Sequence, residues 1–230
     1  MSAPVVFIAA DPRECGPWVA KWSSLEAISS QSHWMRSGVW RGRPMIAIAN
    51  GAGARRAYAA ATQIPQPAQI WNIGFGGAAD PALRAGDIVV ADLVRANGDT
   101  FPCEQPRVVG PFRSGIVQTI ERVAQTAREK RDHFRSGASV VEMEAAGVAR
   151  AASEYHAPFF CVRAISDLAA EDFENDFSAA LRPDGRFSVI RLIAGAMLNP
   201  PSRFGELIRL QKRTAAAAKN LGEFLAHCEF

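Results

Sequence analysis

The fold class can be inferred from residues 159–167, which read Phe159-Phe160-Cys161-Val162-Arg163-Ala164-Ile165-Ser166-Asp167. The first four of these residues form the most apolar run of the chain, and Arg, Ser and Asp close it. A short apolar run bounded by polar residues is typical of a buried strand. Strands of this kind belong to sheets that helices cover, so the stretch predicts an α/β protein.

Similar strand-like runs occur throughout the chain, at 4–9, 44–49, 69–73, 87–93, 115–119 and 139–141. Alanine-rich segments with helical spacing lie between several of them, at 52–62, 124–134, 143–155 and 213–226. This alternation predicts one domain over residues 1–230, a three-layer sandwich with a mixed central β-sheet flanked by helices. A loop and a short helix are expected over 12–34, a hairpin over 33–43, and long loops over 98–115 and 168–186.

Composition limits the classes of partner. The 230 residues are 48% hydrophobic and 21% charged, and 26 basic residues against 23 acidic ones give a net charge of +3. No long basic run concentrates this excess, which argues against nucleic acid as a partner. No run approaches the roughly 18 to 20 apolar residues that cross a bilayer, so we expect no integral membrane segment and a cytoplasmic location.

The cysteines predict neither a disulfide framework nor a metal site. Cys15, Cys103, Cys161 and Cys228 form no CxxC pair and have no histidine at ligand spacing. They are expected to be buried or half-buried thiols in a reducing compartment. We therefore expect no metal ion and no organic cofactor.

Polar residues follow several predicted strands, where parallel α/β sheets bind their ligands. These places are Ala9–Glu14, Asn50–Gly53 and the glycine-rich Asn72–Ala78. Glycines let backbone approach a ligand closely, although Gly74-Phe75-Gly76-Gly77 lacks the GxGxxG spacing of dinucleotide sites. Tight turns alone are the alternative explanation of these glycines.

A second group of polar residues closes two other strands. Glu142 and Glu144 interrupt an otherwise uncharged stretch, and in extended geometry they share one face while Met143 points to the other. Arg163 and Asp167 end the most apolar strand. Such an arrangement suits a polar ligand, and an internal ion pair between Arg163 and a glutamate is the alternative.

With these residues the sequence resembles the nucleoside phosphorylase and nucleosidase superfamily. The resemblance rests on Val141-Glu142-Met143-Glu144 and, about twenty residues further on, Val162–Asp167. It extends in the same order over 9–14, 72–78 and 86–90, and so covers most of the chain to about Asp167. It implies a mixed sheet surrounded by helices, cleavage of the N-ribosidic bond of a small purine nucleoside, and a homodimer or larger homo-oligomer.

The resemblance also implies roles for single residues. Asp167 matches the aspartate that protonates or hydrogen-bonds the purine at N7, and Arg163 and Ser166 would orient it and close the base pocket. Glu144 matches the glutamate that holds the ribose hydroxyls, and Met143 the methionine that packs on the sugar. The remaining residues assigned to substrate binding are Glu142, Gly74, Phe75, Gly76 and Val123.

These residue types suit the chemistry. The bond breaks through an oxocarbenium-like ribosyl cation and a purine that carries negative charge until it is protonated. Asp167 as the acid must hold or share a proton, which burial favours, and the charge of Glu144 stabilises the cation.

The nucleophile distinguishes the branches of the superfamily. Hydrolytic members have a glutamate after the first strand that activates water, and Glu14 matches it. Hexameric phosphorylases have an arginine where this chain has Asn72 and a small polar residue where it has Phe75. Water is therefore favoured. Arg43, Arg55 and Arg56 keep a purine nucleoside phosphorylase as an alternative, and a non-catalytic nucleoside-binding protein is a second one.

The resemblance leaves open which group the nucleoside carries at its 5' position. The candidate substrates are methylthioadenosine or adenosylhomocysteine, and the adenosylated triterpenoid of a hopanoid-associated branch. The turn at 11–14, the loop start at 96–99 and the tail rich in alanine and arginine are closer to that last branch. It would need a wide apolar pocket, and aromatic core packing is the alternative role of the candidate lining residues. These are Trp34, Phe75, Phe101, Phe112, Phe173 and Phe177.

Overall fold

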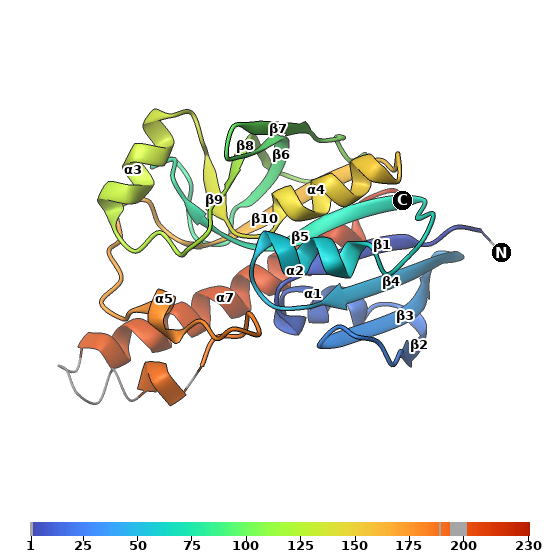
Figure 1. Cartoon of the computed structure of the whole chain (residues 1–230), viewed down its shortest axis with the longest axis horizontal. Helices are drawn as coiled ribbons and strands as arrows, with labels where there is room; N and C mark the ends of the chain where they lie inside the picture. Colours follow the sequence, from blue (N-terminus) through green and yellow to red (C-terminus); the bar gives the residue numbers. More distant parts are fainter. Residues whose placement is uncertain (1, 189, 194–201) are drawn as a thin grey trace.

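The computed structural model describes residues 2–188, 190–193 and 202–230, and its strands join one mixed sheet (Figure 1). Its order is β10 (Phe159–Asp167), β6 (Ile88–Ala96), β8 (Arg113–Thr119), β9 (Val140–Glu142), β5 (Gln69–Ala78), β1 (Val5–Ala9), β4 (Arg43–Ala49), β3 (Trp34–Trp40) and β2 (Ser23–Ala27). A further strand, β7 (Asp99–Pro102), pairs with β6. All seven strands predicted from apolar runs are present, and the predicted mixed sheet is confirmed.

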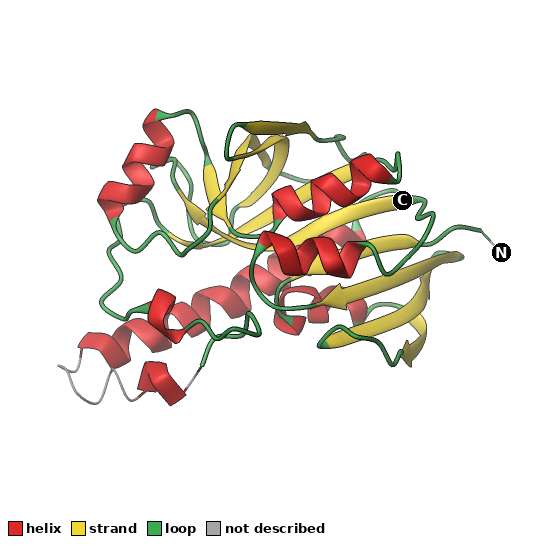
Figure 2. Ribbon diagram, in the orientation of Figure 1, coloured by secondary structure: helices red, strands yellow, loops and turns green. Residues whose placement is uncertain are grey.

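Helices cover both faces of this sheet (Figure 2). On one face α2 (Ala54–Ala61) and α4 (Ala145–Glu154) contribute to one hydrophobic cluster, whereas α1 (Pro12–Val19) and α7 (Ser202–Ala226) contribute to the cluster on the other. Side chains of β1 alternate between the two clusters, as the period of a strand requires. The predicted α/β class with flanking helices is therefore confirmed.

The strand β5 has a special position because it pairs with three neighbours. It lies parallel to β1 and to β10 and antiparallel to β9. Its pairing with β10 closes β10, β6, β8, β9 and β5 into a ring, from which the rest of the sheet extends. The predicted end at Ile73 was wrong: β5 continues through the glycines to Ala78, because β9 and β10 flank Gly77 on both sides.

Connecting segments differ from the predictions in detail. The segment 33–43, expected to be a hairpin by itself, contains the single strand β3, which forms a hairpin with β4 and pairs with it from Trp34↔Ala49 to Trp40↔Arg43. The expected loop over 98–115 contains β7 and the start of β8, and the loop over 168–186 contains the short helix α5 (Phe177–Ala180). The last helix begins at Ser202, earlier than the alanine-rich part indicated. Among the described residues no helix is long and apolar enough to cross a bilayer.

Candidate active site

The end of β5 brings acidic residues from three parts of the chain to one edge of the sheet. Gly77 pairs with Val141 of β9 on one side and with Asp167 of β10 on the other. Since neighbouring strands lie about 4.8 Å apart, the segment that follows Val141 starts close to Asp167. Three residues earlier on β5, Gly74 lies against Glu14 of α1. Three residue steps of roughly 3.3 Å give the site a length of about 10 Å along the strand.

Glu14 is held by backbone N–H groups. Asp11 begins α1 as its N-cap, and Glu14 completes the capping box. Its Oε2 accepts hydrogen bonds from the N–H groups of Ala10 and Asp11 at 2.8 and 2.9 Å, and its Oε1 accepts one from Phe75 at 2.8 Å. Burial raises the pKa of Glu14, against the opposing effect of these N–H groups. A Cβ on residue 74 would lie 2.7 Å from Glu14 Oε1, which is why glycine is required there.

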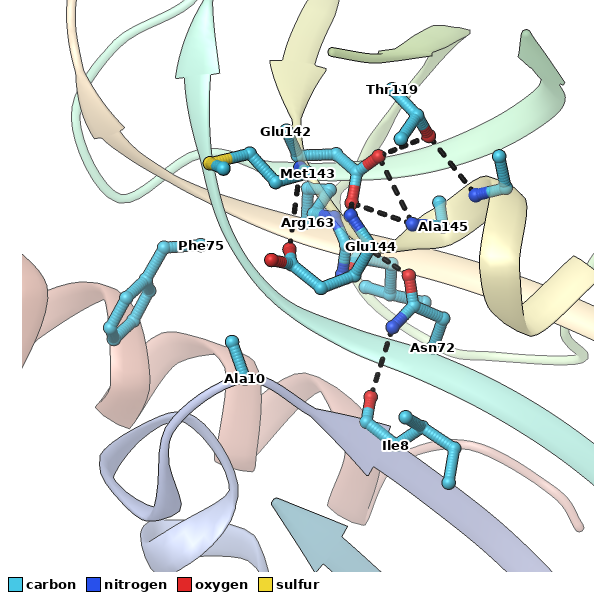
Figure 3. A network of polar contacts seen from close by, with 12 residues as sticks. Ile8, Ala10, Asn72, Phe75, Thr119, Glu142, Met143, Glu144, Ala145 and Arg163 are labelled. Carbon is cyan, nitrogen blue, oxygen red and sulfur yellow. Dashed lines mark hydrogen bonds and ion pairs between the residues drawn. The ribbon is translucent and has the colours of Figure 1, made fainter. Parts of the chain in front are cut away.

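The predicted pair of Glu142 and Glu144 does not share a face. Glu142 lies at the end of β9 and points into the protein, where Arg163 Nη2 is 2.5 Å from its Oε2 and Thr119 Oγ1 is 2.5 Å from its Oε1 (Figure 3). It also accepts hydrogen bonds from the N–H groups of Glu144 and Ala145 at the start of α4. Both members of the Glu142–Arg163 pair are 1% exposed. The structure therefore contains the internal ion pair between Arg163 and a glutamate, which was the alternative interpretation of these residues.

Arg163 is consequently not available for the role that the resemblance implied. It does not contact Asp167. Its Nη2 also donates to Oδ1 of Asn72, and Nδ2 of Asn72 donates to the carbonyl of Ile8 at 3.0 Å (Figure 3). Through its contacts with Glu142 and Asn72, Arg163 of β10 thus links this strand to β9 and β5. The expectation that Arg163 orients Asp167 was wrong, because a fully buried guanidinium pairs with the nearest buried carboxylate.

Glu144 lies at the beginning of α4 and has a strongly perturbed carboxyl group. Its Oε1 accepts a hydrogen bond from the N–H of Gly53 at 2.9 Å, which links α4 to the turn before α2. Burial, and then the negative charge of Glu142, raises the pKa of Glu144 to about 8, while the charge of Arg163 opposes the shift and that of Glu14 adds to it. Met143, beside it, is buried.

Asp167 has two partners, one predicted and one not. Ser166 Oγ donates to its Oδ1 at 2.8 Å, as the resemblance implied. Its Oδ2 lies 2.6 Å from Nζ of Lys130, which is completely buried. A Cβ on residue 77 would lie 2.9 Å from the same Oδ2, so a glycine in β5 makes room for this pair.

Lys130 was not predicted from the sequence, and the reason is its surroundings. It belongs to α3 (Ala127–Arg135), whose sequence AREKRDHFR is nearly all charged or polar. Such a segment indicates a solvated helix, and hydropathy contains no signal that one of its cations is buried. Only the packing of α3 against the end of β10 identifies Lys130.

The other predicted residues lie around the same edge or away from it. Gly76 approaches Val140 and Arg163 closely, and Val123 is half-buried in the segment that precedes α3. The arginines proposed as phosphate ligands do not converge here. Arg43 and Arg55 are exposed, and Arg56 donates to the carbonyl of Pro183.

A hollow of about 380 Å³ lies next to the Lys130 end of the site. Phe173 lines it and also lies under Nζ of Lys130, 4.8 Å from the ring centroid. The other lining residues are Arg122, Gln125, Glu174, Asn175, Asp176 and Ser178, so Glu14, Glu144 and Asp167 are not part of its wall. Of the six predicted aromatic lining residues only Phe173 borders this hollow. Phe75, Phe101 and Trp34 pack against the hydrophobic clusters, Phe112 against Phe224, and Phe177 against Phe173.

Comparisons with known proteins agree with this geometry. The model of the Phosphorylase superfamily matches residues 110–186, which contain β9, the start of α4 and β10. A 5'-methylthioadenosine/S-adenosylhomocysteine nucleosidase of Staphylococcus aureus (strain NCTC 8325 / PS 47) is 28% identical over 193 residues, covering 70% of this chain and 85% of the relative. The chain is thus similar to members of the nucleoside phosphorylase and nucleosidase superfamily, in agreement with the resemblance found in its sequence.

Solved structures of superfamily members show the same fold. The nucleosidase of Neisseria meningitidis, in complex with methylthio-immucillin-A, superposes with a TM-score of 0.73 at 19% identity and covers 98% of each chain. The futalosine hydrolase of Helicobacter pylori superposes with a TM-score of 0.72 at 14% identity, covering 97% of this chain and 95% of the other. In the described part of this chain, no group of three His, Cys, Asp or Glu side chains is arranged to hold a metal ion.

Proposed function

We propose that this protein is an adenine nucleoside hydrolase. The observation that carries the proposal is the set of three buried carboxyl groups, Glu14, Glu144 and Asp167, that the end of β5 collects at one edge of the sheet. Burial of three acids without function would be costly. The named relatives, nucleosidases acting on methylthioadenosine and adenosylhomocysteine, support the same reaction.

Glu14 is the proposed base for water. A carboxylate offers about four lone-pair sites, and three of those of Glu14 accept backbone N–H bonds. One site is left to bind and deprotonate a water molecule, in an orientation that the three bonds fix. Burial raises the pKa of Glu14, which makes it a stronger base than an exposed carboxylate.

Glu144 is the proposed partner of the ribose. With a pKa of about 8 it is largely protonated in the free protein at pH 7. A ribosyl cation next to it favours the ionised form, so charge develops on the carboxyl as the glycosidic bond breaks. An interaction that strengthens toward the transition state accelerates the reaction, whereas one equally strong in the bound nucleoside does not.

Asp167 is the proposed acid at the purine. It lies at the opposite end of the Gly74–Gly77 segment from Glu14, so the attacking water and the departing base have separate places along β5. Ser166 fixes the orientation of its Oδ1. The other proposed substrate-binding residues around Asp167 are Ser166, Val123, Met143, Gly74, Phe75 and Gly76.

The contacts of the arginines favour water over phosphate as the nucleophile. Arg163 is engaged by Glu142 and Asn72, and Arg56 by the carbonyl of Pro183. Phosphorylases need arginines that clamp the phosphate, and Arg43 and Arg55 lie exposed.

The test is base release without phosphate. We expect the protein to release adenine from methylthioadenosine, adenosylhomocysteine or adenosine in a phosphate-free buffer, as followed by chromatography. Release that requires phosphate and yields ribose 1-phosphate would instead establish a phosphorylase. Tight nucleoside binding in calorimetry without turnover over hours would establish a binding protein. Futalosine belongs in the same panel, because a fold neighbour is a futalosine hydrolase.

Two further expectations accompany this function. We propose that the chain forms a homodimer or larger homo-oligomer, which sedimentation velocity tests directly. We also propose a cytoplasmic location, which cell fractionation tests.

A further inference from the structure

The ammonium group of Lys130 is unusually well coordinated. Its Nζ lies 2.6 Å from Oδ2 of Asp167, and it donates to the carbonyl oxygens of Leu168 and Glu171 at 2.9 and 3.3 Å. These three acceptors match the three N–H donors of a lysine, and the ring of Phe173 covers the group. A salt bridge formed only for stability is seldom buried so completely, because both ions lose their hydration.

We propose that Lys130 and Asp167 act as one proton-carrying pair, in which Lys130 holds the proton that Asp167 passes to the leaving purine. The inference rests on the proposed nucleosidase reaction and adds to it the source of the proton. Lys130 is a positioning residue in this scheme, since it acts on the substrate through Asp167.

The transfer balances without any further reactant. The C1'–N9 bond breaks and its electron pair stays on the purine. Asp167 gives a proton to N7 and receives one from Lys130, so the net transfer is from the ammonium group to the base. The neutral amine keeps two N–H donors for the carbonyls of Leu168 and Glu171. The proton that water loses to Glu14 leaves with the products or returns to Lys130 through solvent.

The neighbouring charged groups on α7 and on the segment after β10 are already engaged. The carboxylate of Glu171 pairs with Arg213 at 2.7 Å and accepts the N–H of Leu168 at 2.9 Å. Asp172 accepts the N–H of Ala127 at 2.6 Å.

On α3 itself, Glu129 is bound by Arg122 and by its own capping box. His133 lies among Glu129, Asp132 and Arg95. Of the described charged groups, Asp167 is therefore the one that contacts the Lys130 ammonium directly.

Two variants separate a proton source from a structural ion pair. Lys130→Arg keeps the positive charge but cannot release a proton, because the guanidinium pKa is above about 12. Lys130→Met removes the charge and leaves the proton on Asp167 itself. The pH dependence of kcat for adenine release distinguishes them: the ammonium of the wild type can replace the proton that Asp167 gives away, whereas the carboxyl group of Lys130→Met must regain it from solvent, which supplies fewer protons as the pH rises.

We expect the wild type to keep its kcat above pH 8. Lys130→Met should work at pH 5.5 within about tenfold of the wild type, and its basic limb should move to lower pH by at least about one unit, giving a loss of about 10²-fold at pH 8. Lys130→Arg should be slow across the neutral range, with KM in both variants changed by less than about threefold. Thermal melts confirm that the variants are folded.

Three results would overturn the inference. One is a basic limb that stays in place in Lys130→Met, and another is near wild-type kcat in Lys130→Arg, since each would show that Lys130 only orients Asp167. If neither variant folds, the wild-type profile decides: a basic limb on which kcat already falls as the pH rises toward 7 excludes the pair as the proton source. Absence of adenine release by the wild type would contradict the proposed function rather than this inference.

Discussion

Replacement of Glu14 by glutamine tests the hydrolytic mechanism at its starting point. The amide keeps the shape of the side chain but can no longer take a proton from water. General acid or base catalysis is worth about 10² to 10⁴ in rate, which corresponds to about 2.7 to 5.4 kcal/mol at 1.36 kcal/mol per decade. We therefore expect kcat for adenine release to fall by that factor, with little change in the binding of free adenine.

The same substitution has a separate, calculable effect on stability. If the amide oxygen faces Ala10 and Asp11, the NH₂ group faces the N–H of Phe75, and this buried donor loses its acceptor. The opposite rotamer leaves two donors without an acceptor. One such loss costs about 1–3 kcal/mol, so urea denaturation should show a decrease of this size in the free energy of unfolding.

Glu206→Gln is the matched control. Glu206 on α7 is equally buried, and it accepts hydrogen bonds from the N–H groups of Glu174 and Asn175 at 2.9 Å. Its substitution should lower stability by a similar amount and leave kcat unchanged. A rate in Glu14→Gln within tenfold of the wild type would remove Glu14 from the mechanism, and an equal loss of rate in Glu206→Gln would show that the loss reflects instability.

Three other substitutions test the remaining acids and the ion pair. Asp167→Asn should lower kcat by about 10² to 10⁴ while KM changes little. It should also lower stability, because the buried Lys130 loses its anion. An equal loss in kcat and in nucleoside affinity would limit Asp167 to binding. Glu144→Gln should flatten the pH dependence of stability. The pKa of Glu144 is about 8 in the folded protein against an ordinary 4.5, so the free energy of unfolding of the wild type falls as the pH rises between these two values. Urea midpoints of the two proteins that run parallel between pH 6 and pH 9 would contradict the assignment. Arg163→Met should cost about 3–5 kcal/mol in urea denaturation, since it leaves Glu142 buried without its cation, and a cost below about 1 kcal/mol would mean that the pair is not closed in solution.

The distribution of charge explains why the site combines ionised and protonated acids. Glu14, Glu142 and Glu144 all interact with a single guanidinium, that of Arg163. One cation neutralises one carboxylate, and Glu142 pairs with it directly. Burial raises the pKa values of the other two carboxyl groups, and the negative charge of Glu142 adds to the shift of Glu144.

The strand pattern was predictable because it depends on local sequence. Short apolar runs such as Phe159–Val162 form strands that are buried in the protein, whatever their position in the chain. Because these strands alternate with alanine-rich helices, few arrangements other than a sheet covered by helices are possible. Glu14 and Asp167 could be identified for a related reason: they follow strands at ends where α/β sheets bind ligands.

The roles within the acidic cluster were not predictable in this way. Glu142 and Glu144 have the same side chain and nearly the same position in the chain, yet one pairs with Arg163 and the other does not. The difference arises because β9 ends at Glu142 and α4 begins after Glu144, which turns the two carboxyls in different directions. A two-residue spacing contains no information on such a turn.

Residues that are neighbours in the chain were sufficient to predict seven strands and their alternation with helices, the resemblance to the superfamily, and acidic residues after strand ends, whereas β2 and β7 were not predicted. Only the tertiary structure decided that Arg163 belongs to Glu142, that β5 runs on through its glycines, and that Lys130 lies buried on Asp167. The physical reason is that the pairing of a buried charge depends on which oppositely charged group lies within about 3 Å, and for these groups that partner comes from 21 and 37 positions away in the chain.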